Sequence, residues 1–194
     1  MPTQAERTEA TRGRLIATAR RLFAEQGFAG TSTEQILSET AVSRGALYHH
    51  FPSKTDLFQA TFEQVEDELT AQVLQIAAAG GETDPIRILQ LGFGAFLDQC
   101  LNPEVQRIVM LDGPTVLGWD LWHELDERYA FGTIKAVLTL AAETGRIEPA
   151  TVEPLTHLLL GAIMQAGMVV ARSDDPLTAK KAMTEAFAGI ISTL

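Results

Sequence analysis

The chain has 194 residues, of which 46% are hydrophobic, and a formal net charge of −10. This composition is typical of an ordinary globular protein with a buried core, and the single cysteine, Cys100, excludes an intramolecular disulfide. A net charge of −10 argues against a polyanionic partner, but the charge is uneven, because residues 1–55 carry +2 and residues 56–194 carry −12.

The first part of the chain predicts three helices. Apolar side chains at helical spacing predict a first helix that ends at Gly27, where a C-terminal cap would sit. A short second helix is predicted over residues 33–40, capped by the Ser32 side chain. A third helix is predicted from the N-cap Ser43 until Pro52 prevents its continuation.

A long fourth helix is predicted from Lys54 to near Ala79, where two glycines follow. At 1.5 Å per residue it would be a rod of roughly 39 Å that joins the first three helices rigidly to the rest. Further helices are predicted from Pro85 to before Asn102, over 104–111, over 118–143, over 152–172 and from Pro176 to the end, with a turn at 112–115. No stretch alternates convincingly with a period of two, so the sequence predicts an all-α protein of about nine helices.

The chain is expected to be cytoplasmic, without a membrane span. Residues 1–12 are polar and charged, unlike a leader peptide, and the lone cysteine favours a reducing compartment. The longest nearly apolar run, Leu158–Ala171, is interrupted by Gln165 and is shorter than the ~20 residues needed to cross a bilayer.

Two short helices joined by a tight turn are the arrangement that places a recognition helix in the major groove of DNA. After Ser43, the side chains of Leu47 and Phe51 can pack inward, whereas the small Gly45 and Ala46 leave room for the backbone to approach DNA. The side chains that can donate to base edges or phosphates are Arg44, Tyr48, His49 and Lys54.

The stretch "LFAEQGFAGTSTEQIL…AVSRGALYHHFPSKTDLF", residues 22–58, resembles the DNA-binding domain of the TetR family of bacterial transcriptional repressors. The resemblance covers about residues 9–69, with the helix-turn-helix at 32–51. It implies a DNA-binding domain at 1–53 and a ligand-binding and dimerisation domain at 54–194. The DNA-binding residues that it implies are Thr31, Ser32 and Thr33 at the helix that crosses the backbone, Ser43 as the cap, Arg44, Gly45 and Ala46 at base edges, and Tyr48, His49 and Lys54 at phosphates.

One position departs from the family pattern. Ala41 stands in the turn where the family usually has glycine, and a positive φ at an alanine would cost about 1 kcal/mol.

The resemblance also implies an apolar pocket between helices four to eight, suited to a hydrophobic or aromatic ligand of modest size. Its expected lining is Phe62, Phe93, Phe96, Met110, Trp119, Trp122, His123, Met164 and Met168. Candidate polar contacts are Asp112, Asp120, His123 and Gln165. The alternative is that these side chains simply fill a core, which sequence alone does not distinguish.

Small residues recur at three- and four-residue spacing in the last two helices, which permits close helix contact. In the family such helices form a four-helix dimer interface, and the residues expected there are Leu158, Gly161, Ala162, Ala179, Ala186, Phe187 and Ile190. The alternative is again internal core.

The leading prediction is a homodimeric DNA-binding regulator, a repressor that a small hydrophobic or aromatic ligand releases from a palindromic operator. No cofactor, metal ion or catalytic residue is predicted. A metal ion at the adjacent His49 and His50 is not expected, because their side chains point about 100° apart on a helix. Two alternatives stay open: a helical ligand carrier without DNA binding, and a thiol- or metal-dependent enzyme using Cys100 and His123.

Overall fold

The computed structural model describes residues 3–194, and every side chain among them except that of residue 126. The described residues are helical and contain no strand, which confirms the prediction of an all-α protein. Residues 1 and 2 of the predicted N-terminal domain lie outside the described residues.

Within residues 3–194 the helices join into nine continuous segments. The first four are α1 (Gln4–Gly30), α2 (Thr33–Thr40), α3 (Arg44–His50) and α4 (Lys54–Ala78). The fifth segment is α5 (Pro85–Gln99). In the sixth, α6 (Pro103–Val105) continues into the π-helix η1 (Gln106–Asp112) and then α7 (Gly113–Leu117). In the seventh, α8 (Trp119–Asp126) continues through the π-helix η2 (Glu127–Phe131) into α9 (Gly132–Glu143). The last two are α10 (Val152–Arg172), preceded by the short 3-10 helix η3 (Pro149–Thr151), and α11 (Pro176–Ile191).

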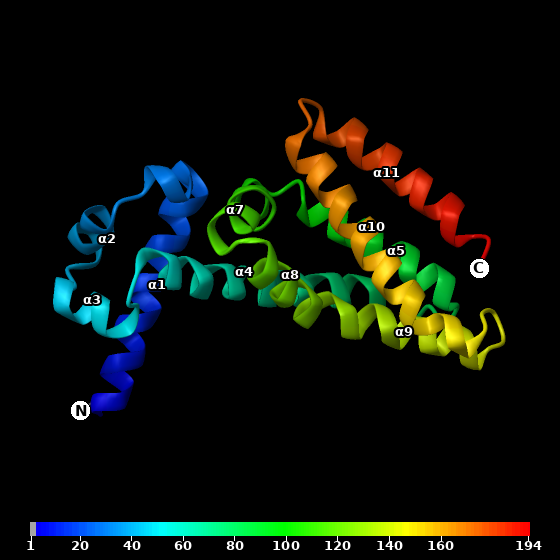
Figure 1. Cartoon of the computed structure of the whole chain (residues 1–194), viewed down its shortest axis with the longest axis horizontal. Coiled ribbons are helices and arrows are strands. Elements are labelled where there is room, and N and C mark those ends of the chain that lie inside the picture. The colour runs from blue at the N-terminus through cyan, green and yellow to red at the C-terminus, as the bar shows by residue number, and fades with distance from the viewer. Residues whose placement is uncertain (1–2) are drawn as a thin grey trace.

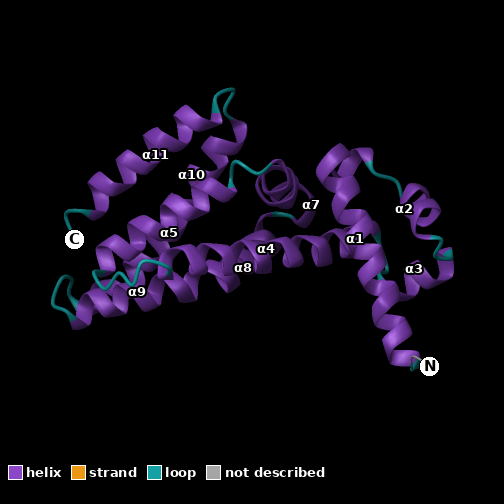
Figure 2. Cartoon of the chain, turned by 180° about the vertical axis from the view of Figure 1, so that it is seen from behind, coloured by secondary structure: helices purple, strands orange, loops and turns teal. Residues whose placement is uncertain are grey.

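Helix α4 connects two groups of helices. In Figure 1, α1, α2 and α3 gather at one end of the molecule, and α5 and α8 to α11 lie around the far half of α4. Figure 2, seen from behind, shows the same division, with α7 between the two groups and α10 and α11 packed as an antiparallel pair. The predicted boundary between residues 53 and 54 falls immediately before α4.

Serine side chains set the starts of α2, α3 and α4, and Ser32 and Ser43 were predicted to do so. The hydroxyls of Ser32, Ser43 and Ser53 accept hydrogen bonds from the backbone N–H groups of the residues three positions on. Between α2 and α3, Ala41 adopts the left-handed conformation with φ of 53°. The family-atypical alanine therefore bears the strain expected of it, about 1 kcal/mol.

The predicted turn at residues 112–115 is wrong, because the chain stays helical from Pro103 to Leu117. Pro114 lies inside this continuous helical segment, two residues after the end of the π-helix η1. Gly113 is there for packing, since a Cβ at this position would lie 2.9 Å from the Phe62 ring.

The predicted end of the first helix at Gly27 is a kink, after which α1 continues for one turn to Gly30. Gly27 has φ of 73°, and a Cβ there would lie 3.3 Å from a carboxylate oxygen of Asp112. Both the conformation and the close approach therefore require glycine at this point.

Candidate DNA interface and ligand pocket

Helix α3 presents one face to solvent and one to the core. Arg44, Gly45, Tyr48 and His49 are exposed, whereas Leu47 is fully buried. Because Leu47 belongs to the hydrophobic cluster shared with α1, α2 and α4, the helix is held firmly while its outer face stays free. These four residues and the exposed Ser43 were predicted to meet DNA, and Ala46, which was also predicted there, is half-buried.

Arg44, the predicted base reader, is paired with Glu34 of α2. Its Nη2 lies 2.8 Å from Glu34 Oε1, and both side chains are about 60% exposed, at 60% and 62%. Hydrogen bonds from its own backbone N–H and from Arg44 hold the pKa of Glu34 below its usual value. An ion pair this exposed is weak, so Arg44 can exchange it for a base or a phosphate.

Lys54, a predicted phosphate contact, binds backbone carbonyl groups at the end of α1. Its Nζ donates to the backbone oxygens of Phe28 at 2.8 Å and Thr31 at 2.9 Å, and it lies 4.0 Å from the centre of the Phe28 ring. Burial lowers the pKa of Lys54. An ammonium group has three donors, so one donor stays available beyond these two carbonyls.

The three residues predicted at the start of α2 are placed differently from one another. Thr31 is buried, at 1% exposure, and its hydroxyl donates to the Gly27 carbonyl, so this side chain does not face DNA. Ser32 is exposed and Thr33 is half-buried. The hydroxyl groups of Ser32 and Thr33 therefore stay accessible at the start of α2, whereas that of Thr31 does not.

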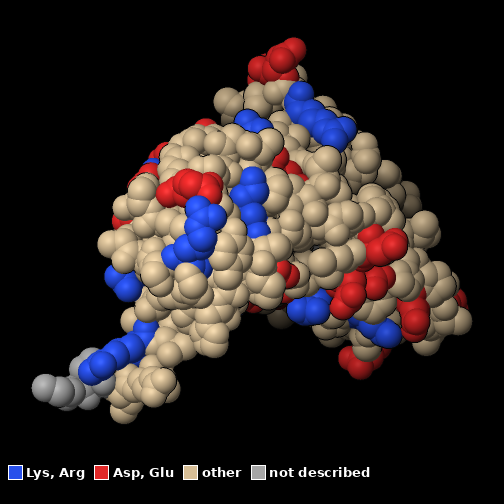
Figure 3. Space-filling model, turned by 60° about the vertical axis from the view of Figure 1, so that its left-hand side comes forward, with Lys and Arg blue, Asp and Glu red and all other residues tan. Residues whose placement is uncertain are grey.

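Acidic side chains partly offset the positive charge on the surface of the N-terminal helices. In Figure 3, where the N-terminal end comes forward, basic side chains are interspersed with acidic ones instead of forming one continuous stripe. Arg21, for example, pairs with both Glu25 and Glu39. The electrostatic contribution to DNA affinity is expected to be modest for this reason.

Gly45→Ala tests whether the backbone of α3 approaches DNA closely. A Cβ at Gly45 would meet nothing within 4 Å in the free protein, and alanine favours a helix over glycine by up to about 1 kcal/mol. We therefore expect unchanged or higher stability in urea denaturation, together with a severalfold loss of DNA affinity in gel-shift titrations. Undiminished DNA affinity would show that the helix backbone does not come close to DNA here.

An apolar cavity of about 150 Å³ lies among α4, α5, η1, η2, α9 and α10. Four residues of the predicted lining are found in its wall: Phe93, Phe96, Met110 and Met164. The other wall residues are Glu66, Leu69, Thr70, Val73, Leu74, Ala77, Ile88, Leu89, Gly92, Tyr129, Ala130, Thr133, Ile134, Val137 and Ile163.

The remaining predicted lining residues lie elsewhere. Phe62 and Trp122 are buried in the core beside Gly113, and Met168 is half-buried outside the cavity wall. Trp119 is 65% exposed and stacks on the exposed His123 at 5.8 Å between ring centres. Helical spacing identified apolar positions but could not show which of them border empty space.

The predicted polar contacts are also outside the cavity wall. Asp120 and Gln165 are exposed, and Asp112 faces α1. The structure adds Glu66 and Tyr129 to the wall instead. Glu66 could have been found from the sequence, because it follows Phe62 by four residues and precedes Leu69 by three on the apolar stripe of α4.

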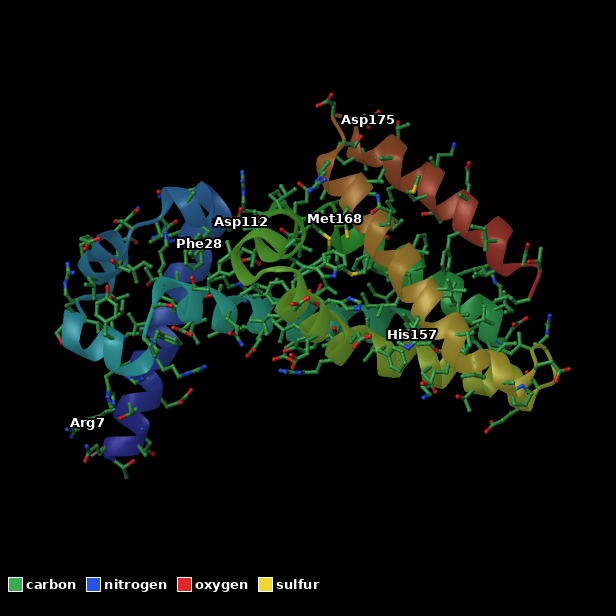
Figure 4. The ribbon with its side chains drawn as sticks, in the orientation of Figure 1. Arg7, Phe28, Asp112, His157, Met168 and Asp175 are labelled. Carbon is green, nitrogen blue, oxygen red and sulfur yellow. The ribbon has the colours of Figure 1, made fainter. Side chains whose placement is uncertain are left out.

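Asp112 connects the C-terminal helices to the N-terminal ones. Its Oδ2 accepts a hydrogen bond of 2.7 Å from the backbone N–H of Phe28, immediately after the kink in α1. Figure 4 shows the two residues side by side, with Arg7 at the opposite end of α1. Met110, in the cavity wall, is only two residues from Asp112 on the π-helix η1.

A second connection is made by Arg20 of α1. Its guanidinium donates to both carboxylate oxygens of Glu104 and of Glu68, all at 2.7 Å. Arg20 holds the pKa of Glu68 below its usual value. Helices α1, α4 and α6 are therefore tied together by paired, charge-assisted hydrogen bonds.

The thiol of Cys100 is a poor nucleophile. It is completely buried, and burial, with the charge of Glu66, raises its pKa to about 12. Among the described residues, no group of three or more His, Cys, Asp and Glu side chains could hold a metal ion. The burial and the raised pKa of Cys100 disfavour the thiol-dependent enzyme.

An exposed face of small and apolar residues runs along α10 and α11. Leu158 is 69% exposed and Ile190 64%, and Gly161, Ala162 and Ala186 are also exposed, while Ala179 is half-buried. Phe187 was predicted on this face but is buried, because its ring stacks on Phe93 at 3.9 Å. We call the exposed set Leu158, Gly161, Ala162, Ala186 and Ile190 the small-residue face.

The segment Pro149–Arg172 is long and apolar enough to cross a membrane by length and composition alone, with a mean hydropathy of 1.5. A third of its most apolar window is buried inside the chain. The small-residue face accounts for part of the remaining apolar exposure.

Models of two protein families match the chain. The model described as bacterial regulatory proteins, tetR family, matches residues 15–61, and the model described as Tetracyclin repressor-like, C-terminal domain, matches residues 87–194. The first match contains α2 and α3, and the second contains α10 and α11.

Two curated proteins have related sequences. The Transposon Tn10 TetC protein of Escherichia coli is 26% identical over 161 residues, which are 83% of this chain and 80% of that protein. The HTH-type transcriptional regulator CymR of Pseudomonas putida is 38% identical over 112 residues, which are 57% of this chain and 55% of CymR. The chain thus matches only about half of the length of CymR.

Solved structures share the whole architecture. A TetR-family transcriptional regulator from Pectobacterium atrosepticum is 30% identical with a TM-score of 0.83, and the alignment covers 97% of this chain and 95% of that one. RolR, solved in complex with resorcinol, is 23% identical with a TM-score of 0.67 over 96% of this chain and 90% of RolR. The second likeness concerns the fold alone.

Proposed function

Because the chain belongs to the TetR family of transcriptional regulators, with a DNA-binding helix-turn-helix, we propose that it is a homodimeric repressor that a small ligand releases from its operator. The observation that carries the proposal is the outer face of α3, which exposes Arg44, Gly45, Tyr48 and His49 on a helix anchored by Leu47. Such a helix fits the major groove of DNA.

The proposed dimer forms through the small-residue face of α10 and α11. Exposed Leu158 and Ile190 would bury apolar area there, and Gly161, Ala162 and Ala186 would let the helices approach closely. A two-fold dimer places its two recognition helices about 34 to 36 Å apart, so the operator is expected to be a palindrome or near-palindrome.

The proposed effector occupies the cavity walled by α4, α5, α9 and α10. A cavity of about 150 Å³ with apolar walls has the size that accepts a single aromatic ring. RolR, which shares the fold, was solved with resorcinol, a one-ring compound, and this supports an effector of similar size.

The proposed release acts through η1. A ligand that displaces Met110 in the cavity wall would also move Asp112, which holds the N–H of Phe28 in α1. Since α2 and α3 directly follow α1 in the chain, this movement would shift them and change the separation of the two recognition helices in the dimer. A preference of about 1 to 3 kcal/mol for the altered separation is enough to reduce occupancy of the operator.

Selection of bound DNA from a random pool tests the proposal as a whole. We expect a palindromic sequence to be enriched, and a library of one-ring aromatic compounds to contain members that release the protein from it. A pool without any enriched sequence would contradict the repressor and favour the ligand carrier without DNA binding.

Asp112→Ala tests the route through η1. The variant loses the acceptor for the Phe28 N–H, and a charge-assisted hydrogen bond contributes about 1.5 to 3 kcal/mol. We expect the effector found in the screen to bind with unchanged affinity in calorimetry but to release the operator at concentrations about tenfold higher or more.

Asp112→Asn is the matched control, because its side-chain oxygen still accepts a hydrogen bond. It should release the operator more like the unchanged protein than Asp112→Ala does. Equal release by Asp112→Ala and the unchanged protein would place the coupling outside this contact.

A further inference from the structure

The apolar cavity is closed at one end. Its wall there includes Leu69 of α4 and Met110 of η1, which are 7% and 1% exposed, together with Phe96 of α5. Helix α10 packs directly on two of these side chains, because a Cβ at Gly167 would lie 3.0 Å from the Phe96 ring and 3.2 Å from the sulfur of Met110. A ligand at this end is therefore enclosed by α4, α5, η1 and α10.

The other end of the cavity reaches the surface. Helices α4 and α5 pack on each other and are joined by the short connection 79–84, so they run antiparallel. Toward this connection the wall continues over Leu74, which is 44% exposed, and the half-buried Ala77 and Ile88. The cavity therefore opens between the end of α4 and the start of α5.

The cavity wall is longer than one aromatic ring. Along α4 it runs from Leu69 to Ala77, which at 1.5 Å per residue is about 12 Å. The cavity volume of about 150 Å³ has the size that accepts a single ring. A ring at the closed end thus leaves part of this length for a substituent that points toward the surface, and the side chains of Val73, Leu74 and Ile88 favour an apolar one.

Gly92 of α5 lies between the two ends of the cavity. It is part of the wall and stands four residues from Ile88 and four from Phe96, about one helical turn in each direction. A Cβ at this position would meet no atom of the described residues within 4 Å, so the space beside its backbone is empty. Any larger side chain at position 92 would occupy that space.

We propose that the effector is a single aromatic ring that carries an unbranched apolar chain, and that Gly92 determines this preference. The ring lies at the closed end, against Phe96 and Met110, and the chain passes Gly92 and leaves the cavity near Ala77. A polar group at the far end of the chain then lies in water. This inference rests on the proposed function of the cavity as the effector site.

Calorimetry on the full chain with 2-phenylethanol, 4-phenylbutan-1-ol and 8-phenyloctan-1-ol tests the chain. These probes share the ring and the terminal hydroxyl and differ only in the number of CH₂ groups between them. Each buried CH₂ group should tighten binding by about fourfold, so 4-phenylbutan-1-ol should bind about tenfold or more tightly than 2-phenylethanol. Outside the cavity the additional CH₂ groups lie in water, so 8-phenyloctan-1-ol should gain much less for each of them.

A branched isomer separates the shape of the chain from its apolar area. 2-Methyl-1-phenylpropan-2-ol has the same formula as 4-phenylbutan-1-ol, but its additional carbons are two methyl groups on one carbon close to the ring. It should bind severalfold more weakly than 4-phenylbutan-1-ol, because a branched chain cannot follow the passage along Gly92 to the surface.

Gly92→Leu tests the passage itself. The leucine side chain would occupy the empty space, so 4-phenylbutan-1-ol should lose its advantage over 2-phenylethanol. Gly94→Leu is the matched control, because Gly94 lies on the same helix, is not among the described residues that line the cavity, and has the same free space at its Cβ position. Leucine favours a helix over glycine, so both variants should stay folded, which urea denaturation measures.

Equal affinities for the three linear probes would overturn the inference, as would equal binding of the two isomers or a full gain with chain length in Gly92→Leu. If 2-phenylethanol binds and a longer chain adds nothing, only this inference fails, and the cavity stands as a site for a single ring. If no probe binds at millimolar concentration, the proposed effector site fails with it. Operator binding without ligand is measured separately by gel shift, so the proposed DNA binding is tested independently of every probe.

Discussion

Arg44→Ala is expected to lower affinity for the selected operator by about tenfold to a hundredfold while it lowers affinity for random DNA much less. The guanidinium of Arg44 can donate two hydrogen bonds to one guanine, and such a pair discriminates against the wrong base by about 1 to 3 kcal/mol. Gel-shift titrations of both DNAs at one salt concentration measure the difference. Equal losses on both DNAs would show that Arg44 only contacts phosphate.

Two further variants serve as comparisons for Arg44→Ala. Tyr48→Phe removes an exposed hydroxyl from the same face of α3 and should weaken binding similarly on all sequences. Glu34→Ala frees Arg44 from its ion pair and removes a negative charge beside the DNA, so it should strengthen binding. Weaker operator binding by Glu34→Ala would mean that Glu34 positions Arg44 for reading.

Ala162→Arg is expected to convert the proposed dimer into a monomer and to reduce operator affinity by roughly a hundredfold or more, because the second half-site then no longer binds at high effective concentration. Ala162 is exposed on the small-residue face, beside Gly161, where two helices are proposed to approach closely. An arginine at this position is too large for such a contact and adds a charge that would be buried. Analytical ultracentrifugation at micromolar concentration measures the assembly.

Ala71→Arg provides the same substitution at an exposed position of α4 outside the small-residue face, and it should remain dimeric and bind the operator normally. A monomeric unchanged protein at micromolar concentration would contradict the proposed dimer. A dimeric Ala162→Arg would place the interface on another surface.

The starts of α2, α3 and α4 and the end of α3 could be predicted because local interactions decide them. Ser32, Ser43 and Ser53 cap the helices through backbone groups only three residues away, and Pro52 ends α3 by its own covalent structure. The strained turn at Ala41 was implied by the resemblance, because the family usually has glycine at this position. Short-range patterns therefore determined the recognition helix and the family.

The same local rules were insufficient around residues 112–115. Aspartate, glycine and proline in sequence favour a turn, but here Gly113 packs against Phe62 and the chain stays helical through η1 and α7. A contact between segments outweighed the local preference for a turn.

Only the tertiary structure decided which apolar residues border the cavity and what its polar groups are. Helical spacing shows which side of a helix is apolar, but how deeply a residue is buried depends on how several helices pack. Phe62 and Trp122 therefore fill the core while Phe93 and Met110 border the cavity, and Glu66 joins them as its carboxylate. The bond from Phe28 to Asp112 spans 84 residues of sequence, and no pattern in either segment could indicate it.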